Sequence, residues 1–438
     1  MNVVSQVSRA MQTVLTTEAR RMAVRYGVIQ RKRKLDGSSL VQGLVFGWMT
    51  HPDASLEQLA QTTAACGVSL TPQALDQRFT PALAECLRAL LELAVAQTID
   101  AQPGAIELLN RFNGVYLLDS TVIVLPDPLK DLWPGCGGAG GRAAMKLQVD
   151  LDLRGGRLQG PALTPGRAAE QRGELCLKPT PAGSLRLADQ GYFNLWQLGR
   201  WADEETGWLM RLSCGTAVYD VQGRRLDLLQ FLRRQSCPVD LDVKVGTRQK
   251  MPCRLLVWRV DPRRVRRRRA YAQRMACKRG YEASARKLAW CRYDMAITNL
   301  PADRLSVAEA RVLLRARWQV EMLFKLWKSY GLVDESRSQK PWRILAEVYA
   351  KLIALVIQHW LLLACHWDRP HRSWFRAIRT LEDHALLLAY HLGSRRQLAL
   401  ICQRIRACLA ACGRTNVRNK SPSTYQLLTN PSLASTLT

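Results

Sequence analysis

The sequence has few acidic residues for its length. Its 438 residues include 36 Asp and Glu against 64 Lys and Arg, which gives a formal net charge of +28. A soluble protein this basic repels itself at physiological salt unless a polyanion is its usual partner. Nucleic acid is therefore the leading candidate partner and an anionic membrane the second. An enzyme for small acidic substrates needs only a local basic site, so the global excess argues against that class.

Motifs for disulfides, zinc and nucleotide phosphates are also missing. The 13 cysteines are odd in number and form no Cys-x-x-Cys pair, and the six histidines show no metal-binding spacing. This pattern is typical of a reduced protein, so we expect a cytoplasmic location and neither a disulfide framework nor a zinc ribbon. The glycine-rich segment 135–141 lacks the Gly-Lys-Ser/Thr ending of a phosphate loop, so we assign no cofactor-binding residues.

Uninterrupted apolar runs are absent as well. The N-terminal 20 residues carry early charges and no apolar core, which argues against a signal peptide. The most apolar stretch, Tyr349–Trp367, contains Lys351, Gln358, His359 and His366. These polar residues predict a buried helix rather than a membrane span, and we expect no membrane partner.

Residues 1–112 have a helical pattern. Ser55 and Thr71-Pro72 are typical helix starts on either side of the turn at Cys66-Gly67. This layout resembles a helix-turn-helix that reads DNA, and an ordinary helical bundle is the alternative. The outer face of the second helix would carry Gln73, Asp76, Gln77 and Arg78.

The pattern changes to a mixed α/β type after residue 113. Short apolar or alternating segments predict five strands, and a helix is expected between the last two. The predicted strands are Val115–Leu125, Met145–Leu153, Arg157–Leu163, Ser184–Asp189 and Trp208–Leu212. Residues 214–303 interrupt this pattern with three further alternating segments, and helical sequence resumes from Ser306.

Two carboxylates follow apolar strand segments. Asp119 comes after Val115–Leu118, and Asp189 comes after Leu185–Ala188. A carboxylate at a buried strand end needs a cation, a metal ion or a proton to compensate its charge. Together the two can bind a divalent metal through oxygen ligands, and capping of the following turns is the alternative for either one. Lys146, one predicted strand away from Asp119, is a further residue that can approach such a site.

A third carboxylate, Glu321, lies in a predicted helix. Arg317, Lys325 and Lys328 are spaced four to seven residues from it, which places all four side chains on one helix face. A solvated salt-bridge face is the alternative. We expect flanking apolar residues to bury most of this helix, which disfavours that alternative; they are Trp318, Leu323, Phe324 and Trp327.

These residues resemble a known signature. Arg317, Glu321 and Lys328 match the last three parts of the Y-x2-R-x3-E-x6-K pattern of DDE transposases of insertion-sequence family four. Leu118-Asp119-Ser120-Thr121 resembles that family's first-aspartate strand, and Asp189-Gln190-Gly191-Tyr192 resembles the second. One position departs from the pattern, because the signature tyrosine is replaced by Leu314.

The resemblance implies an α/β fold with a ribonuclease H-like core. It implies a helical DNA-binding region over 1–112, the core in two parts over 113–213 and 304–350, a β-rich insertion over 214–303, and a helical C-terminal region with a polar tail over 351–438. It further implies a bacterial, nucleoid-associated protein that acts on double-stranded DNA, at transposon ends and at a target, as a homodimer on DNA.

The resemblance also implies a chemistry. Asp119, Asp189 and Glu321 would be the catalytic carboxylates and would hold two Mg²⁺ ions, for which Mn²⁺ would substitute. Such ions activate a water and stabilise the leaving 3′ oxygen during phosphodiester cleavage, and the released 3′-hydroxyl then attacks the target. Arg317, Lys325 and Lys328 would contact DNA phosphates. Tyr192 is either a base-stacking residue or a core residue.

An arginine run extends from residue 263 to 269. Arg266, Arg267 and Arg268 are expected to contact the DNA backbone, and a solvated helix is the alternative. Two other functions share most of these features. One is a non-integrating nuclease on the same core, and the other is a catalytically silent DNA-binding repressor of transposition.

Overall fold

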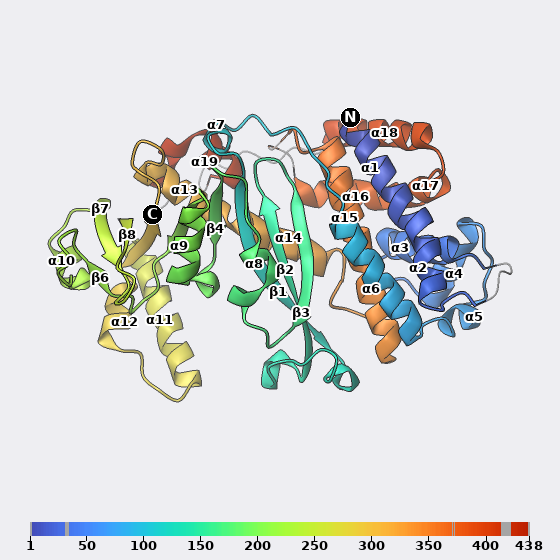
Figure 1. Cartoon of the computed structure of the whole chain (residues 1–438), viewed down its shortest axis with the longest axis horizontal. Coiled ribbons are helices and arrows are strands. Elements are labelled where there is room, and N and C mark those ends of the chain that lie inside the picture. The colour runs from blue at the N-terminus through green and yellow to red at the C-terminus, as the bar shows by residue number, and fades with distance from the viewer. Residues whose placement is uncertain (1, 31–34, 370, 372, 413–421, 437–438) are drawn as a thin grey trace. The chain divides into compact units, whose positions relative to one another are not determined.

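Strand β1 (Val115–Leu125) belongs to both folded units of the chain, because its first four residues are in unit 2 and the rest are in unit 1. In the computed structural model, residues 2–30, 35–369, 371, 373–412 and 422–436 are described (Figure 1). Unit 1 comprises Met1–Ala105, Asp119–Leu175 and Val320–Asn416, and unit 2 comprises Ile106–Leu118, Cys176–Gln319 and Val417–Thr438. Part of the predicted polar tail, 413–421, lies outside the described residues.

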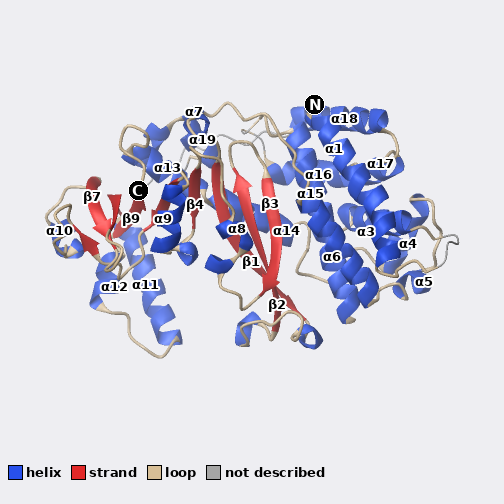
Figure 2. Cartoon of the chain, in the orientation of Figure 1, coloured by secondary structure: helices blue, strands red, loops and turns tan. Residues whose placement is uncertain are grey.

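Unit 1 is mostly helical, as Figure 2 shows. Its N-terminal helices include a π-helical segment, Thr13–Glu18, between the first two. The helices of this first group are α1 (Val3–Gln12), α2 (Ala19–Arg25), α3 (Gly37–Thr50), α4 (Leu56–Ala65), α5 (Pro72–Asp76) and α6 (Pro81–Val95). The second group is α14 (Trp318–Ser329), which starts in unit 2, α15 (Pro341–Cys365), α16 (Trp374–Asp383), α17 (Ala385–Tyr390) and α18 (Arg395–Cys412).

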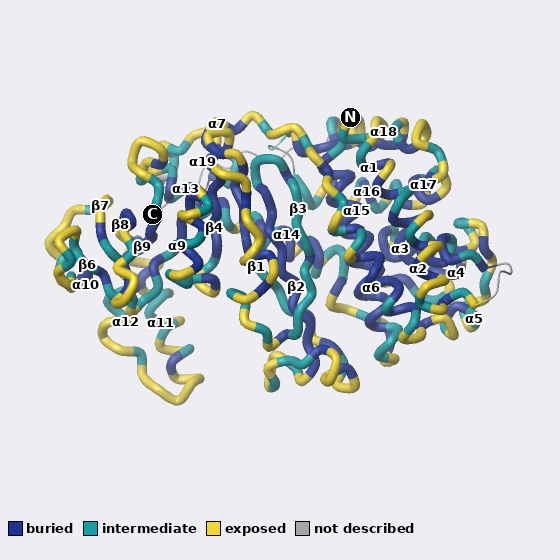
Figure 3. The backbone as a smooth tube through the Cα atoms, in the orientation of Figure 1, coloured by how far each residue is buried: buried dark blue, intermediate teal, exposed yellow. Residues whose placement is uncertain are grey.

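The long helix α15 is the centre of unit 1. It packs against α1, α3, α6, α16 and α18, and nearly all of its residues from Ile344 to Cys365 are buried (Figure 3). By length and composition alone it could cross a membrane, but 94% of its most apolar window is buried inside the fold. Such burial is typical of the core helix of a globular protein, and the polar residues of this stretch predicted a buried helix.

The predicted helix starts at Ser55 and Thr71 are confirmed as N-caps. Ser55 forms a capping box with Gln58, and the Thr71 hydroxyl accepts from Ala74 N. Helix α5 is only five residues long. Asp76, one of the residues expected on its DNA-facing side, instead forms ion pairs within the protein. The Asp76 carboxylate pairs with Lys340 at 2.5 Å and with Arg343 at 3.4 Å, which anchors α5 to the start of α15.

The strands of unit 1 form a hairpin beside β1. Strand β2 (Ala143–Asp152) pairs antiparallel with β3 (Leu158–Pro165), and the order is β3–β2–β1. Short elements follow these strands: the 3₁₀ turns Asp127–Leu129, Gly138–Gly140 and Glu170–Arg172, and helix α8 (Glu174–Leu177), which ends in unit 2.

Unit 2 continues the sheet from the first four residues of β1. Its order is β1–β4–β5–β9–β8–β7–β6, with β1, β4 and β5 parallel and the remainder antiparallel. The strands are β4 (Leu185–Ala188), β5 (Gly207–Arg211), β6 (Val218–Tyr219), β7 (Val239–Val245), β8 (Met251–Arg259) and β9 (Tyr293–Thr298). The expected mixed α/β class is confirmed, and the strands from 214–303 extend this one sheet rather than form a sheet of their own.

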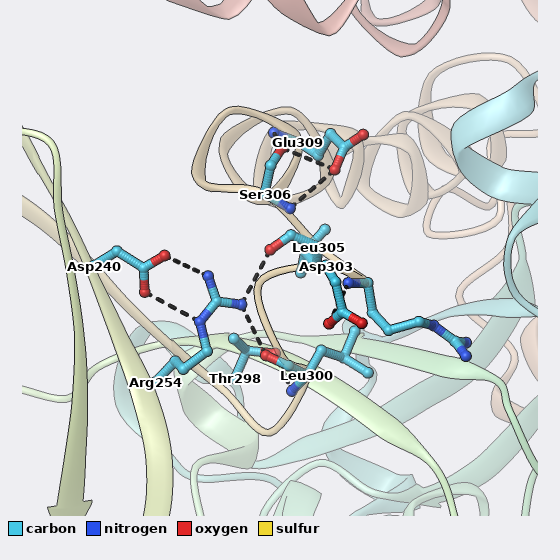
Figure 4. A network of polar contacts seen from close by, with 9 residues as sticks. Asp240, Arg254, Thr298, Leu300, Asp303, Leu305, Ser306 and Glu309 are labelled. Carbon is cyan, nitrogen blue, oxygen red and sulfur yellow. Dashed lines mark hydrogen bonds and ion pairs between the residues drawn. The ribbon is translucent and has the colours of Figure 1, made fainter.

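The helices of unit 2 lie between and after these strands. They are α7 (Glu107–Asn110), α9 (Leu195–Asp203), α10 (Leu228–Arg233), α11 (Pro262–Lys278), α12 (Ala285–Trp290), α13 (Val307–Ala316) and α19 (Thr424–Thr429), with 3₁₀ segments Gln190–Tyr192 and Pro431–Thr436. One buried arginine ties a strand to the start of α13, as Figure 4 shows. Arg254 on β8 pairs with Asp240 on β7 and donates to the carbonyls of Leu300 and Leu305 at 2.8 and 3.0 Å.

Candidate active site

Asp119 lies where β1 loses one of its neighbours. Leu118 is the last β1 residue paired with β4, and its partner is Ala188, the last residue of β4. The four residues of β1 up to Leu118 are buried, whereas the next four, starting with Asp119, are partly exposed. The Ser120 backbone N–H donates to Asp119 Oδ1 at 2.8 Å. The sequence therefore places a carboxylate directly after the last β1 residue that pairs with β4.

Asp189 follows β4 directly and precedes a single 3₁₀ turn. Its side chain is 48% exposed, and its Oδ1 lies 3.8 Å from Nη2 of Arg317. The Arg317 side chain is only 14% exposed, so its guanidinium is held largely inside unit 2. The turn after Asp189 is fixed because Gln190 Nε2 donates to the Leu212 carbonyl at 3.1 Å. Asp189 and Arg317, far apart in the sequence, are thus neighbours, as the signature implies.

The predicted helix around Glu321 is interrupted. We expected Arg317 and Glu321 on one helix, but α13 ends at Ala316, Arg317 forms its C-cap, and α14 begins at Trp318. Glu321 lies in the first turn of α14 and is partly exposed. The expected burial of flanking residues is confirmed for Leu323, Phe324 and Trp327 and wrong for Trp318, which is 54% exposed.

Lys328 fastens α14 to β1 within unit 1. Its ammonium donates to the Val122 carbonyl at 2.8 Å and lies 3.6 Å from the Asp334 carboxylate. Lys325 is exposed, and its ammonium lies 6.0 Å from the centre of the Phe375 ring. The two lysines therefore differ, because Lys328 has protein partners for its charge whereas Lys325 faces solvent beside an aromatic ring.

The turn that follows α14 is anchored by a buried ion pair on α15. Lys351 and Glu347 lie 2.7 Å apart with side chains 2% and 5% exposed, and Lys351 also donates to the carbonyls of Leu332 and Glu335. Burial lowers the pKa of Lys351, and the Glu347 carboxylate opposes that shift. These bonds fix the segment that carries Asp334, the partner of Lys328.

Tyr192 has no exposed surface. Its side chain is fully buried in unit 2, so the stacking role considered for it is wrong for this structure and the core role holds. An aromatic ring without exposed faces has no surface on which a base can stack.

The arginine run forms the start of α11, and its members have different surroundings. Arg266 and Arg267 are exposed, as predicted for DNA-contacting side chains. Arg268 differs from the prediction of a DNA-contacting side chain, because its Nη2 donates to Asp294 Oδ1 at 2.8 Å. Arg211 donates to the same oxygen at 2.8 Å. Burial alone raises the pKa of Asp294, but the two guanidiniums outweigh burial and lower it. Arg268 therefore attaches α11 to β9.

Sequence reasoning missed one carboxylate that contacts Ser120, the residue after Asp119. The Ser120 hydroxyl donates to Oε1 of Glu170 at 2.6 Å. The two residues are fifty positions apart, so no spacing motif could have connected them. Lys146, expected to approach the site, donates instead to the Ala168 carbonyl, two residues before Glu170.

The candidate residues are divided between the two units. Unit 1 contains Asp119, Glu321, Lys325 and Lys328, and unit 2 contains Asp189, Tyr192, Arg317 and the arginines of α11. Among the residues that the structure describes, no three His, Cys, Asp or Glu side chains form a group suited to a metal ion.

Comparison with known proteins shows the class of this chain. A family model described as "Transposase DDE domain" matches residues 110–357, which is more than half of the chain. The chain belongs to this family. It is therefore a DDE transposase, an enzyme that cleaves DNA and transfers strands, and members of this class use divalent metal ions.

The individual relatives are transposases of insertion sequences. That of element IS231F from Bacillus thuringiensis subsp. israelensis is 25% identical over 431 residues, which cover 91% of this chain and 90% of the relative. That of IS231C from subsp. berliner is 26% identical, with coverages of 84% and 82%. That of IS1151 from Clostridium perfringens is 23% identical, with coverages of 75% and 74%. The resemblance to insertion-sequence transposases drawn from the sequence motifs is confirmed.

One solved structure also covers most of the chain. A piggyBac transposase synaptic complex with hairpin DNA matches 94% of this chain and 86% of its own, with a TM-score of 0.48 and 10% sequence identity.

Proposed function

We propose that this transposase cleaves DNA at the inverted-repeat ends of an insertion sequence and joins the released 3′ ends to target DNA. Asp119, Asp189 and Glu321 are its catalytic carboxylates and hold two Mg²⁺ ions, which Mn²⁺ can replace. The observation that carries this proposal is the register of β1 and β4, in which Leu118 and Ala188 are partners. Asp119 and Asp189 directly follow this last pair in the sequence, which supports a shared role for the two carboxylates.

The donor set suits such ions. Carboxylate oxygens are the ligands that Mg²⁺ prefers, and the partial exposure of all three side chains leaves them accessible from solvent. When bound, the metal ions supply an activated water and a stabilised leaving oxygen for phosphodiester cleavage. The part of the protein is to hold the carboxylates in place and the DNA phosphates beside them. Arg317, which already neighbours Asp189, is suited to hold the phosphate next to the reacting bond.

The bond between Lys328 and Val122 supports the proposed place of Glu321. Glu321 precedes Lys328 by seven residues, or about 10 Å of helix at 1.5 Å per residue. Asp119 precedes Val122 by three residues, or about 10 Å of strand at 3.3 Å per residue. We propose that α14 runs along β1 in the same direction, so that the Lys328–Val122 bond brings Glu321 to the level of Asp119. We assign Lys328 this positioning role in addition to a phosphate contact.

The strand order supports a ribonuclease H-like core. Strands β3–β2–β1 in unit 1 and β1–β4–β5 in unit 2 have an antiparallel hairpin followed by parallel strands. We assign the core to 113–213 and 304–350, with 214–303 as a β-rich insertion that adds β6 to β9 to the sheet edge. We assign DNA binding to the helical region 1–112 and a supporting role to 351–438.

Exposed cations support a DNA interface beyond the carboxylates. Arg266, Arg267 and Lys325 are exposed, and the net charge of +28 favours contact with a polyanion. We propose that these side chains bind phosphates along the transposon end. A homodimer would bring two ends together, and the basic chain would associate with the nucleoid in the bacterial cytoplasm.

The test of the site is cleavage of DNA carrying the terminal repeats that flank the gene. Asp119→Ala and Glu321→Ala should each reduce Mg²⁺-dependent cleavage at the repeat boundary by about 1000-fold or more, since metal-ion catalysis contributes several kcal/mol. Binding of the same DNA should persist. Asp203→Ala, an exposed carboxylate at the end of α9, is the control and should cleave normally. Retained cleavage in Asp119→Ala would refute the proposed site.

A further inference from the structure

The segment between β3 and α8 brings a fourth carboxylate beside the first-aspartate strand of unit 1. Glu170 Oε1 accepts the hydroxyl proton of Ser120 at 2.6 Å, and the Ser120 backbone N–H donates to Asp119 Oδ1 at 2.8 Å. A hydrogen bond from a hydroxyl to an ionised carboxylate is about twice as strong as one between neutral groups. Ser120 thus contacts two carboxylates, because its backbone N–H donates to Asp119 and its hydroxyl donates to Glu170.

Two polar side chains of β2 hold this segment in place. Lys146, which is 9% exposed, donates to the Ala168 carbonyl, and Gln148, which is 2% exposed, donates to the Glu170 carbonyl at 3.1 Å. The backbone of Gly166 donates to Ala144 at 2.8 Å. Because buried donors of this kind are costly to leave unpaired, they fix the backbone on both sides of Ala169.

Glycine at two positions allows the close approach. A Cβ on Gly173 would lie 2.1 Å from the Gln148 amide oxygen, and a Cβ on Gly166 would lie 2.6 Å from the Ala144 Cβ. Both ends of the segment therefore lie against β2 at distances that a larger residue would not permit. The bonds from Lys146, Gln148 and Gly166 therefore hold the segment that carries Glu170 against β2.

We propose that Glu170 is a positioning residue for Asp119 and acts through Ser120. The inference rests on the proposed role of Asp119 as a metal ligand. Beyond Leu118, β1 has no β4 partner, so the backbone at Ser120 lacks the restraint that β4 gives to residues Val115–Leu118. The bond from Glu170 supplies that restraint and keeps the Ser120 N–H directed at one Asp119 oxygen. The charge of Glu170 adds to the negative potential that attracts a divalent cation.

The test compares Mn²⁺ binding by the full-length protein on pre-cleaved transposon-end DNA, measured from the electron paramagnetic resonance signal of free Mn²⁺. Glu170→Ala and Ser120→Ala should each weaken Mn²⁺ binding by about 10- to 100-fold, the usual cost of losing a group that orients a metal ligand. The double variant should bind Mn²⁺ no more weakly than Glu170→Ala, because Ser120→Ala removes only a connection that Glu170→Ala has already removed. Glu170→Gln keeps an acceptor oxygen for Ser120 and should lose less than Glu170→Ala.

The controls separate this inference from the proposed site. Glu174→Ala removes an exposed carboxylate four residues away and should leave Mn²⁺ affinity unchanged. Affinity for the DNA end should stay at the wild-type level in every variant. Mn²⁺ affinity that is unchanged in Glu170→Ala, or losses that add in the double variant, would overturn the role of Glu170. Unchanged Mn²⁺ affinity in Asp119→Ala would instead overturn the site itself.

Discussion

Neighbouring arginines on α11 have opposite surroundings. Arg267 is exposed, whereas Arg268 shares the Asp294 carboxylate with Arg211. A helix turns by about 100° per residue, so consecutive side chains point in different directions. Of the three arginines expected to contact DNA, Arg266 and Arg267 are exposed, and Arg268 secures the helix that presents them.

The pair allows a matched test of DNA contact. Arg267→Ala should weaken DNA binding and reduce the slope of log K against log salt by about 0.9, the effect of losing one phosphate contact. Its free energy of unfolding should change by less than about 0.5 kcal/mol. Arg268→Ala should lower that free energy by about 1–3 kcal/mol, because Asp294 loses one of its two cations. Salt-dependent binding and urea unfolding measure both, and an unchanged slope for Arg267→Ala would contradict the DNA contact.

At the scale of elements, α15 is joined to the β2–β3 turn by a buried histidine. His359 Nε2 donates to the Gly156 carbonyl at 2.7 Å, and Trp367 Nε1 donates to the Arg154 carbonyl at 3.1 Å. Gly156 has φ of +79°, and a Cβ there would lie 2.4 Å from Leu363. The turn and the helix therefore fit together only with glycine at this position.

This joint predicts a loss of stability in mild acid. Burial lowers the pKa of His359 from 6.5 to about 4, although the bond to Gly156 opposes the shift. Below pH 6.5 the unfolded chain binds a proton that the folded chain does not, so stability falls as pH drops from 6.5 towards 4. The loss between pH 7 and pH 5 should be about 2 kcal/mol. His359→Gln should remove that part of the pH dependence in urea unfolding, and an identical pH dependence in wild type and variant would contradict it.

At the scale of the whole molecule, the charge and the reaction both favour assembly on DNA. With a net charge of +28, two free copies repel each other, and DNA neutralises that repulsion. An insertion sequence has two ends, and each needs a set of catalytic carboxylates. We therefore expect association to depend on the DNA ends.

Light scattering on a sizing column tests this expectation. The protein alone at physiological salt should have the mass of one 49.4 kDa chain, and with terminal-repeat DNA it should form a complex of two chains and two ends. DNA of the same length without the repeat is the control and should not give this defined complex. Full cleavage of both ends by a complex with one chain would contradict the dimer.

Much of the fold follows from local patterns in the sequence. Alternation and apolar runs predicted β1 to β5 and β7 to β9 to within a few residues, whereas the two-residue strand β6 was not predicted. Capping residues predicted the starts of α4 and α5. The motifs around Asp119, Asp189 and Glu321 pointed to the transposase class that the family match shows. These features depend on neighbours within about ten residues, which a sequence displays directly.

Tertiary structure decided what each polar side chain does. Arg267 and Arg268 are adjacent arginines in the same run, but only Arg268 points to Asp294 and pairs with it. Tyr192 is a core residue because of what packs around it. The bond between Glu170 and Ser120 spans fifty residues and depends on how β2 holds the following loop. Residue type and spacing determined which strands and helices form and which chemistry they carry. Contacts between distant segments determined which charges are neutralised inside the protein and which stay available for DNA.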